Sequence, residues 1–294
     1  MQTDLRHGLL APWKAWPHVM RILFIGDIFG RPGRDLVRDA MRPLTARYQI
    51  DLVVANAENA ASGAGVTRDT GDALLDAGVD VMTSGNHIWD KKETLTYIGA
   101  EPRLLRPVNM AAGAPGRGVF VTRAAGGRPV GVINAMGRIF MPPVDNPFEA
   151  VNAAVAELQH ECRIILVDMH AEATSEKVAM GWYLDGRVSA VVGTHTHVQT
   201  ADARVLPGGT AYITDVGMTG PHDSVIGMQR EAVLNRFVNG LPARMEPAAD
   251  NPRLQAVVLT IDDATGRASG IERIDWSADD ITQARSALRD DEPV

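Results

Sequence analysis

The sequence of 294 residues has a single cysteine, Cys162, and no excess of positive charge. One cysteine excludes an internal disulfide framework and is typical of a reducing compartment. A formal net charge of −7 does not provide the excess of positive charge that is typical of proteins binding duplex DNA. We therefore do not expect a dedicated DNA-binding protein. Cys162 directly precedes the apolar run RIILVDM, and we interpret it as a packing residue without a catalytic role.

Long apolar runs are also missing. No stretch approaches the roughly 18 to 20 apolar residues that a membrane span requires, and residues 1–19 lack the apolar core of a secretory signal. We therefore predict a cytoplasmic protein that does not bind membranes. The strand pattern MRILFIGD begins at Met20, which predicts a disordered extension over 1–19, a single domain over 20–280 and a polar tail over 281–294, with fraying from residue 284 onward.

Short runs of apolar and β-branched residues alternate with amphipathic stretches of helical length. This alternation is typical of an α/β fold with buried, largely parallel strands. Residues 254–275 instead predict two strands joined by an Asp/Gly turn, hence an antiparallel pair and a mixed sheet system. Asn146 and Thr174 are the expected caps of two helices. The earlier predicted strands cover 21–27, 50–58, 79–86, 131–137, 163–170 and 188–194.

The predicted strands end in polar side chains. In open α/β sheets the ligand crevice lies beyond the carboxyl ends of the strands, so these side chains should gather at one edge. Carboxylate, amide oxygen and imidazole bind divalent ions such as Mn²⁺, Fe²⁺ or Zn²⁺, and the lack of thiolates argues against a structural zinc site. The residues concerned are Asp27, Glu58, Asn59, Asn86, His87, His170 and His195, with His197 two positions further on.

Each of these residues also has an ordinary explanation. Asp and Asn at strand ends are common turn or cap residues, and a lone buried histidine is often only hydrogen-bonded. His195 and His197 form a stronger signal, because on an extended segment their side chains share one face while Thr196 points into the fold. Polar groups at five successive strand ends favour a metal site, since independent turn chemistry does not produce such a recurrence.

The strand-end residues lie in or near six motifs, which read GDIFGRPGR, NAENA, GNHIWD, HAEATSEK, GTHTHVQTAD and DVGMTG. Together these motifs resemble the YmdB-like branch of the calcineurin-like metallophosphoesterases, from about Met20 to Ile274. The resemblance implies a four-layer α/β/β/α sandwich of the metallophosphoesterase type, with one carboxylate bridging two metals. It implies Asp27, Glu58, Asn59 and His197 as ligands of the first metal, Glu58, Asn86, His170 and His195 as ligands of the second, and His87 as the catalytic histidine.

Two features depart from the wider superfamily. Most members carry Asp-x-His after the first strand, whereas here Phe29 stands at the histidine position, and Asn59 is expected to supply the missing contact. Most members also bridge the metals with the aspartate of a Gly-Asp pair, where this sequence has Glu58. The YmdB-like branch shares both departures. They therefore argue against a generic phosphatase of the superfamily more than against a member of the YmdB-like branch.

A dinuclear centre requires no serine or cysteine nucleophile. Two cations a few ångströms apart lower the pKa of a bridging water toward neutrality and hold the phosphoryl oxygens for in-line displacement, so that hydroxide attacks phosphorus directly. His87 is placed to protonate the leaving oxygen or to stabilise the developing charge. Asp90 either orients His87 or caps a helix.

The resemblance implies phosphodiester hydrolysis, with 2′,3′-cyclic nucleotides as the leading candidate substrate. It also implies two divalent or mixed-valence ions, Fe and/or Mn, and a homo-oligomer. Two alternatives stay open: a phosphomonoesterase acting on nucleotides or small phosphates, and a regulatory protein that binds RNA or a partner with weak catalysis. A (β/α)8 metal-dependent amidohydrolase also collects ligands at strand ends, but the antiparallel C-terminal pair argues against it.

Overall fold

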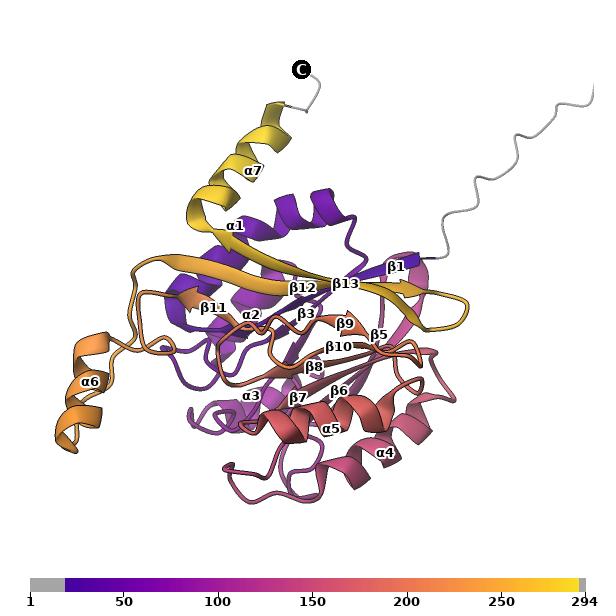
Figure 1. Ribbon diagram of the computed structural model, residues 1–294, viewed down its shortest axis with the longest axis horizontal. Helices are drawn as coiled ribbons and strands as arrows, with labels where there is room; N and C mark the ends of the chain where they lie inside the picture. The colour runs from indigo at the N-terminus through magenta and orange to yellow at the C-terminus, as the bar shows by residue number, and fades with distance from the viewer. Residues whose placement is uncertain (1–18, 291–294) are drawn as a thin grey trace, which may run out of the picture.

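The computed structural model describes residues 19–290, which form two open β-sheets flanked by helices (Figure 1). Two open sheets exclude the (β/α)8 barrel. The predicted extension over 1–19 lies outside the described residues except for Val19, where the first strand begins. Residues 291–294 also lie outside them. No helix within the described part of the chain is long and apolar enough to cross a membrane.

The first sheet contains the N-terminal strand and the C-terminal strand pair. β1, β3 and β4 run parallel, while β12 runs antiparallel to β1 and pairs with β13 in the predicted antiparallel ladder. In order of position this sheet reads β2-β11-β12-β1-β3-β4, with β13 beside β12. Its strands among residues 19–290 are β1 Val19–Ile25, β2 Asp27–Ile28, β3 Leu52–Asn56, β4 Val81–Thr83, β11 Met218–Pro221, β12 Pro252–Asp262 and β13 Ala268–Ser277.

The second sheet is built by the middle of the chain. β6, β7, β8 and β10 are parallel neighbours, and β5 and β9 form the two edges in antiparallel pairing. These edge strands were not predicted, because they are partly or fully exposed and lack a buried apolar run. The strands in the described part of the chain are β5 Val119–Arg123, β6 Pro129–Met136, β7 Ile164–His170, β8 Ala190–Thr194, β9 Arg204–Val205 and β10 Ala211–Ile213.

Helix starts follow local capping chemistry. The side chain of Asn146 accepts a hydrogen bond from the Phe148 N–H, as predicted for a cap, and Pro147 takes the first helical position. Thr174 is the first residue of its helix rather than the cap, which is Ala173. The helices within residues 19–290 are α1 Gly30–Tyr48, α2 Arg68–Asp76, α3 Thr94–Ala100, the 3₁₀ turn η1 Ala125–Gly127, α4 Pro147–Leu158, α5 Thr174–Leu184, α6 Arg230–Asn239 and α7 Ala278–Asp290.

Three clusters of buried apolar side chains hold these elements together. One lies between the two sheets and includes Phe24 of β1 and Leu166 of β7. A second joins the first sheet to helices that include α1, which contributes Val37. A third joins the second sheet to α4 and α5, where Met180 is buried. These clusters cover both faces of each sheet. Because neither face meets water, the strands have continuous apolar runs.

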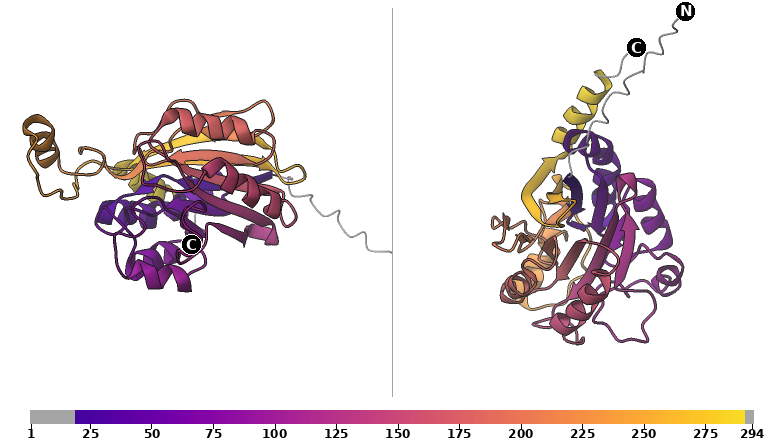
Figure 2. Two further views of the ribbon diagram at one scale, coloured as in Figure 1. Left: turned by 90° about the horizontal axis from the view of Figure 1, so that it is seen from below. Right: turned by 90° about the vertical axis from the view of Figure 1, so that its right-hand side faces the viewer.

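The C-terminal tail predicted over 281–294 is helical as far as the structure describes it. Ile281 of α7 is buried in the cluster around α1, and Arg285 forms an ion pair with Asp39 of α1. Figures 1 and 2 show α7 extending from the end of the long β13 strand. The prediction of fraying was wrong for 284–290, which belong to this helix. A buried apolar residue and an ion pair hold one face of the helix against the protein, while its other face stays in water.

Candidate metal centre

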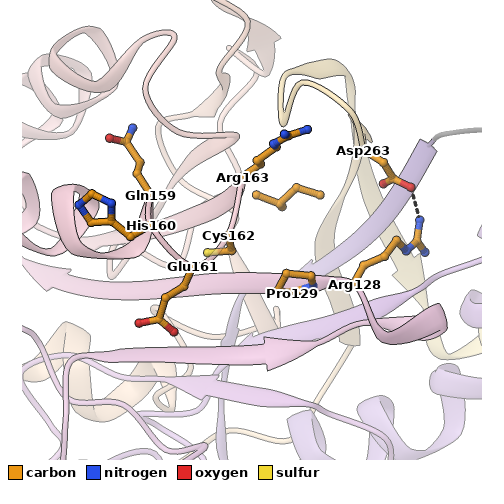
Figure 3. Close-up of a pocket in the computed structure, with 9 residues that line it drawn as sticks. Arg128, Pro129, Gln159, His160, Glu161, Cys162, Arg163 and Asp263 are labelled. Carbon is orange, nitrogen blue, oxygen red and sulfur yellow. Dashed lines mark hydrogen bonds and ion pairs between the residues drawn. The ribbon is translucent and has the colours of Figure 1, made fainter.

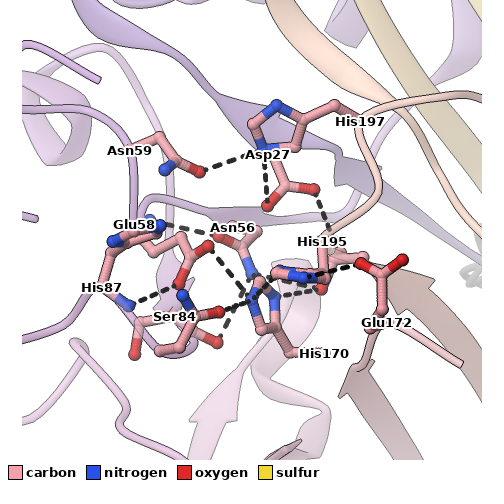
Figure 4. Close-up of polar contacts among 12 residues, drawn as sticks. Asp27, Asn56, Glu58, Asn59, Ser84, His87, His170, Glu172, His195 and His197 are labelled. Carbon is pink, nitrogen blue, oxygen red and sulfur yellow. Dashed lines mark hydrogen bonds and ion pairs between the residues drawn. The ribbon is translucent and has the colours of Figure 1, made fainter. Parts of the chain in front are cut away.

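The side chains predicted at the strand ends lie together at one end of the two sheets (Figure 4). Their positions follow from strand direction, since parallel strands of both sheets finish at this end. Asp27 follows β1, Glu58 and Asn59 follow β3, Asn86 and His87 follow β4, His170 ends β7, and His195 and His197 follow β8.

Glu58, Asn86, His170 and His195 form one half of the cluster, called the His170 half below. His170 Nε2 lies 3.1 Å from Glu58 Oε1 and 3.0 Å from Asn86 Oδ1. It also lies 3.1 Å from His195 Nδ1. One ligand atom each from Glu58, His170 and His195 lie within 4.8 Å of one another, a spacing compatible with one shared cation.

Asp27, Asn59 and His197 form the other half, called the Asp27 half below. His197 Nε2 lies 3.3 Å from Asn59 Oδ1 and 3.8 Å from Asp27 Oδ1. The Asn59 amide nitrogen donates to the Gly63 carbonyl, which turns the amide oxygen toward the cluster. His197 Nδ1 donates to the Ile226 carbonyl at 2.9 Å, which leaves Nε2 as the nitrogen able to bind a metal.

Asp27 is buried without full hydrogen bonding. Its Oδ2 accepts a bond of 3.1 Å from the His195 N–H. Its Oδ1 is one of three buried side-chain atoms among the described residues that have no hydrogen-bond partner. Burial raises the pKa of Asp27 well above its usual range, because water no longer solvates the carboxylate. A cation would satisfy this oxygen, so the residues of the Asp27 half fit a metal ion.

Glu58 and His170 form a buried ion pair. Burial by itself raises the pKa of Glu58, but the charge and hydrogen bond of His170 outweigh it and bring the pKa to about 2. Burial lowers the pKa of His170, and the Glu58 charge outweighs it and brings the pKa to about 9. Burial and the neighbouring His170 lower the pKa of His195 to about 3, which keeps this ring neutral. Its Nε2 lies 3.1 Å from Glu172 Oε2, a contact that the sequence did not predict.

Three further residues that sequence reasoning missed hold His170 in place. His170 Nδ1 donates to Thr194 Oγ1 at 2.9 Å, and the Thr194 hydroxyl donates to Asp168 Oδ1 at 2.7 Å. Asn56 donates to Asp168 Oδ2 and accepts from the Glu58 N–H, both at 3.1 Å. This relay keeps His170 Nε2 directed at the cluster. The signal available in the sequence was Asp168, because a carboxylate inside an apolar run requires buried partners.

His195 and His197 do not lie on an extended strand. β8 ends at Thr194, and the two histidines have left-handed backbone angles, with φ of 99° and 66°. The prediction that strand alternation brings both side chains to one face was therefore wrong, because a turn directs them to the two halves of the cluster. Thr196 points into the fold as predicted, and its hydroxyl donates to buried Asp215 at 2.7 Å.

Asp215 anchors this turn, a role that the sequence did not reveal. Its Oδ2 accepts from the Thr196 N–H at 3.0 Å and from Lys177 Nζ at 2.7 Å. Its Oδ1 accepts from the Gly217 N–H at 2.8 Å. Both members of the Lys177–Asp215 ion pair are buried, so removing one alone would cost about 3 to 5 kcal/mol by leaving the other charge unpaired.

His87 lies beside the cluster and is open to solvent. Its backbone N–H donates to Glu58 Oε2 at 3.1 Å, and its side chain is 39% exposed. Its Nδ1 lies 2.8 Å from Asp90 Oδ2. Asp90 therefore orients the ring and does not cap α3, whose N-cap position is Glu93. This geometry leaves Nε2 of His87 for exchange of a proton with a ligand.

Two close contacts set the shape of the centre. A side chain at Gly85 would collide with the His170 ring and the Glu58 carboxylate. The buried ring of Phe29 meets the ring of His197 edge-on, with centroids 5.8 Å apart. Phe29 thus packs against a proposed ligand with an apolar ring and contributes no donor atom.

A cavity of about 330 Å³ lies elsewhere, where η1, the end of α4 and the β12–β13 turn come together (Figure 3). Arg128 bridges one side of it to Asp263 at 2.6 Å. Cys162 lines this cavity and belongs to the core cluster of the second sheet, as expected for a packing residue. Burial raises the pKa of its thiol, which disfavours the thiolate that a nucleophile requires.

Comparisons with known proteins agree with this arrangement. The family described as YmdB-like protein matches residues 23–274. A 2′,3′-cyclic-nucleotide 2′-phosphodiesterase from Bacillus subtilis is 51% identical over 255 residues, which are 87% of this chain and 96% of the relative. A crystal structure of a hypothetical protein from Thermus thermophilus matches with a TM-score of 0.82 and 44% identity, over 88% of this chain and 99% of that one.

A crystal structure of a phosphatase from Mycoplasma pneumoniae matches with a TM-score of 0.83 and 35% identity, over 88% of this chain and 94% of that one. Both structures share the mixed α/β arrangement with two sheets described above. The family match covers the strands that carry the cluster of acidic, amide and imidazole side chains. The chain therefore belongs to the YmdB-like family.

Proposed function

We propose that this chain is a metal-dependent phosphodiesterase that hydrolyses 2′,3′-cyclic nucleotides. The observation that carries the proposal is the divided cluster, in which donor atoms of Glu58, His170 and His195 lie within 4.8 Å of one another and a buried oxygen of Asp27 lacks a hydrogen-bond partner. The identity of 51% with the B. subtilis cyclic-nucleotide phosphodiesterase, over 96% of its length, supports the reaction and the substrate.

The two halves correspond to two cation sites that share Glu58. Carboxylate, amide oxygen and imidazole together suit Mn²⁺ or Fe ions, as two divalent ions or a mixed-valence pair. The unpartnered oxygen of Asp27 and the close donor atoms around His170 support this assignment. We assign Asp27, Glu58, Asn59 and His197 to one cation, and Glu58, Asn86, His170 and His195 to the other.

When bound, two such cations lower the pKa of water and neutralise charge on the phosphoryl oxygens. The chain supplies orientation and a proton. His87 Nε2 donates a proton to the leaving 2′ oxygen while the bond from phosphorus to that oxygen breaks. Asp90, at 2.8 Å from Nδ1, keeps the ring in the orientation that this transfer needs. Water provides the new oxygen on phosphorus, and the product retains a 3′-phosphate.

The fold and assembly that we propose follow the family. One apolar cluster lies between the first sheet and its helices, one between the two sheets, and one between the second sheet and its helices. These three interfaces support the four-layer α/β/β/α sandwich of the metallophosphoesterases. α6 stands away from the rest of the chain (Figures 1 and 2), and Leu234, Phe237 and Val238 on it are 55%, 78% and 78% exposed. An apolar face of this kind supports a homo-oligomer in which α6 packs against a second copy.

A phosphomonoesterase acting on nucleotides is the second candidate, because the structurally similar M. pneumoniae protein is described as a phosphatase. Both reactions would use the same cluster and differ in whether a diester or a monoester is cleaved. The regulatory RNA-binding alternative draws no support from the described residues, whereas the donor atoms of Glu58, His170 and His195 lie close enough to share a cation.

The test uses the full-length protein loaded with Mn²⁺ and compares two diesters. We expect hydrolysis of 2′,3′-cyclic AMP and of bis-p-nitrophenyl phosphate. His87→Ala should lose roughly 10²- to 10⁴-fold in kcat on cyclic AMP. The loss on bis-p-nitrophenyl phosphate should be smaller, because nitrophenolate leaves without a proton.

The matched control is His160→Ala, which removes an exposed histidine at the separate cavity and should keep full activity. Equal losses of His87→Ala on both diesters would contradict the role of His87 as an acid. Hydrolysis of nucleotide monoesters alone would favour the phosphomonoesterase.

A further inference from the structure

The most exposed large apolar side chain in the described chain is Phe140, at 89%. It lies in the segment 137–145 between β6 and α4, called the Phe140 loop below. A bulky ring facing water gains nothing from burial, so this side chain is free to contact a ligand. The proposed function assigns no role to this ring or to the loop that carries it.

The Phe140 loop begins beside a proposed metal ligand. β6 and β7 are parallel neighbours that pair Met136 with His170. The next residue, Gly137, donates its N–H to the His170 carbonyl at 2.9 Å. Three residues span at most about 11 Å, so the Phe140 backbone lies within that distance of Gly137. The loop therefore leaves the second sheet at the same end as the metal centre.

Two buried side chains hold the loop in a defined position. Glu176, 6% exposed, accepts hydrogen bonds from the backbone N–H groups of Arg138 and Ile139 at 3.0 to 3.3 Å. Asn109, 1% exposed, donates to the carbonyls of Met136 and Asp145, at 2.7 and 2.9 Å. Both ends of the loop are thus tied to the body of the protein, and the ring at its tip is carried by an ordered backbone.

The backbone of Phe140 is itself unusual. Its φ of 61° lies in the left-handed region, which suits glycine or asparagine far better than an aromatic residue. Local packing does not explain a phenylalanine here, because its side chain faces water. The structure thus keeps an aromatic ring where neither backbone preference nor burial favours one. Glu176 belongs to the HAEATSEK motif, so part of that motif serves to position this loop.

We propose that the Phe140 loop is a nucleobase subsite, in which the Phe140 ring stacks on the base of a nucleotide whose phosphate lies at the metal centre. This inference rests on the proposed function. It adds recognition of the nucleobase to hydrolysis of the phosphodiester. Stacking on an aromatic side chain accepts any base, since every base has a π-face, so the subsite selects nucleotides without selecting among them. An ordered loop loses little conformational entropy on binding.

The main experiment compares two cyclic phosphates with the Mn²⁺-loaded protein: 2′,3′-cyclic AMP and the 2′,3′-cyclic phosphate of methyl riboside, which lacks a base. Phe140→Asn removes the ring and suits the left-handed backbone, so the variant should fold normally. We expect KM for cyclic AMP to rise roughly 5- to 150-fold, as expected for one lost stacking contact, with kcat nearly unchanged. The baseless substrate should show no change, and Phe140→Trp should retain wild-type KM for cyclic AMP.

The control is Trp182→Asn, which removes another exposed aromatic side chain, near the end of α5, and should leave KM for cyclic AMP unchanged. An equal loss of Phe140→Asn on both substrates would overturn the subsite, because it would indicate a structural role. An unchanged KM for cyclic AMP would overturn it as well. A changed molecular mass of Phe140→Asn by light scattering, with unchanged KM, would place the ring at a contact between copies.

A binding measurement separates this inference from the proposed function. Calorimetry with adenosine 3′-phosphate measures binding without turnover. Phe140→Asn should raise the Kd roughly 5- to 150-fold, the effect expected for loss of one stacking contact. If no cyclic nucleotide is hydrolysed but this dependence on Phe140 holds, the subsite stands and the proposed reaction falls. If cyclic AMP is hydrolysed and binding does not depend on Phe140, the reaction stands and the subsite falls.

Discussion

The two halves of the metal centre neutralise a buried carboxylate in different ways. In the His170 half, Glu58 is paired with a protonated histidine at 3.1 Å. In the Asp27 half, burial lowers the pKa of the neighbouring His197, so this ring is neutral, and one oxygen of Asp27 has no hydrogen-bond partner among the described residues. The chain by itself pairs the carboxylate of the first half, whereas the carboxyl of the second half needs a cation or a proton.

This difference predicts that each incoming cation competes with a proton on a different group. In the His170 half an incoming ion has to replace a proton on His170, so its affinity should rise with pH. In the Asp27 half an incoming ion has to replace a proton on the carboxyl of Asp27, whose pKa burial raises well above its usual range. We therefore expect the affinity of both halves for metal ions to fall as the pH is lowered.

The largest expected effect comes from Glu58→Gln, which should break both halves at once. Loss of the shared charge should reduce kcat on 2′,3′-cyclic AMP on the order of 10³-fold, because the developing negative charge loses its electrostatic stabilisation. Metal bound per chain, measured by elemental analysis after dialysis, should fall as well. Glu161→Gln, at the separate cavity, is the matched control and should keep both. Full metal content in Glu58→Gln would show that the two halves do not share this residue.

An intermediate effect is expected from Asp27→Asn, which sharpens the comparison. Because Asp27 is buried with a raised pKa, its charge destabilises the metal-free fold at neutral pH. An asparagine at this position carries no such charge, so the metal-free variant should gain about 1 to 3 kcal/mol in free energy of unfolding, measured by urea titration in chelator. The same variant should no longer be stabilised fully by Mn²⁺. If the metal-free variant is less stable than the metal-free wild type, the buried charge of Asp27 does not destabilise the fold.

The smallest expected effect is a pH dependence of the metal-free protein. The pKa of Glu58 is about 2, below the ordinary 4.5, so its contribution to stability is present above pH 4.5 and is lost as pH falls toward 2. The pKa of His170 is about 9, above the ordinary 6.5, so its contribution is present below pH 6.5 and is lost as pH rises through 9. The pair should therefore stabilise most between pH 4.5 and 6.5.

Calorimetry in chelator measures this effect as the difference in Tm between wild type and the double variant Glu58→Gln/His170→Gln. The difference should be largest in the window between the two ordinary pKa values and should shrink toward alkaline pH. A difference that stays constant from roughly pH 5 to pH 10 would mean that the two groups do not titrate as a pair.

Strand direction explains why the sequence located this cluster. Side chains that follow the carboxyl ends of parallel strands meet at one edge, and the structure brings together every predicted residue from Asp27 to His197. Their binding of metal ions stays a prediction. The supporting residues Asn56, Asp168 and Thr194 were missed, because a polar side chain within a strand gives no sign of which partner it meets across 26 or more residues of sequence.

Other features depended on tertiary structure. The left-handed turn at His195 and His197 is not visible in sequence, because neither residue type requires it. α7 was missed because its sequence is mostly polar, and Ile281 is buried only where tertiary structure brings α7 against the apolar cluster around α1. The antiparallel β12–β13 pair was predicted correctly, since a local turn signal connects strands adjacent in sequence.

Gly85 limits how this sequence can change over evolutionary time. Every amino acid that could replace a glycine brings a Cβ, and any Cβ at this position collides with His170 and Glu58. At Gly99 of α3, nothing lies within 4 Å of the same added atom, so substitution there meets open space. Gly85 and Gly99 lie on neighbouring segments, but only Gly99 can accept a side chain without a collision.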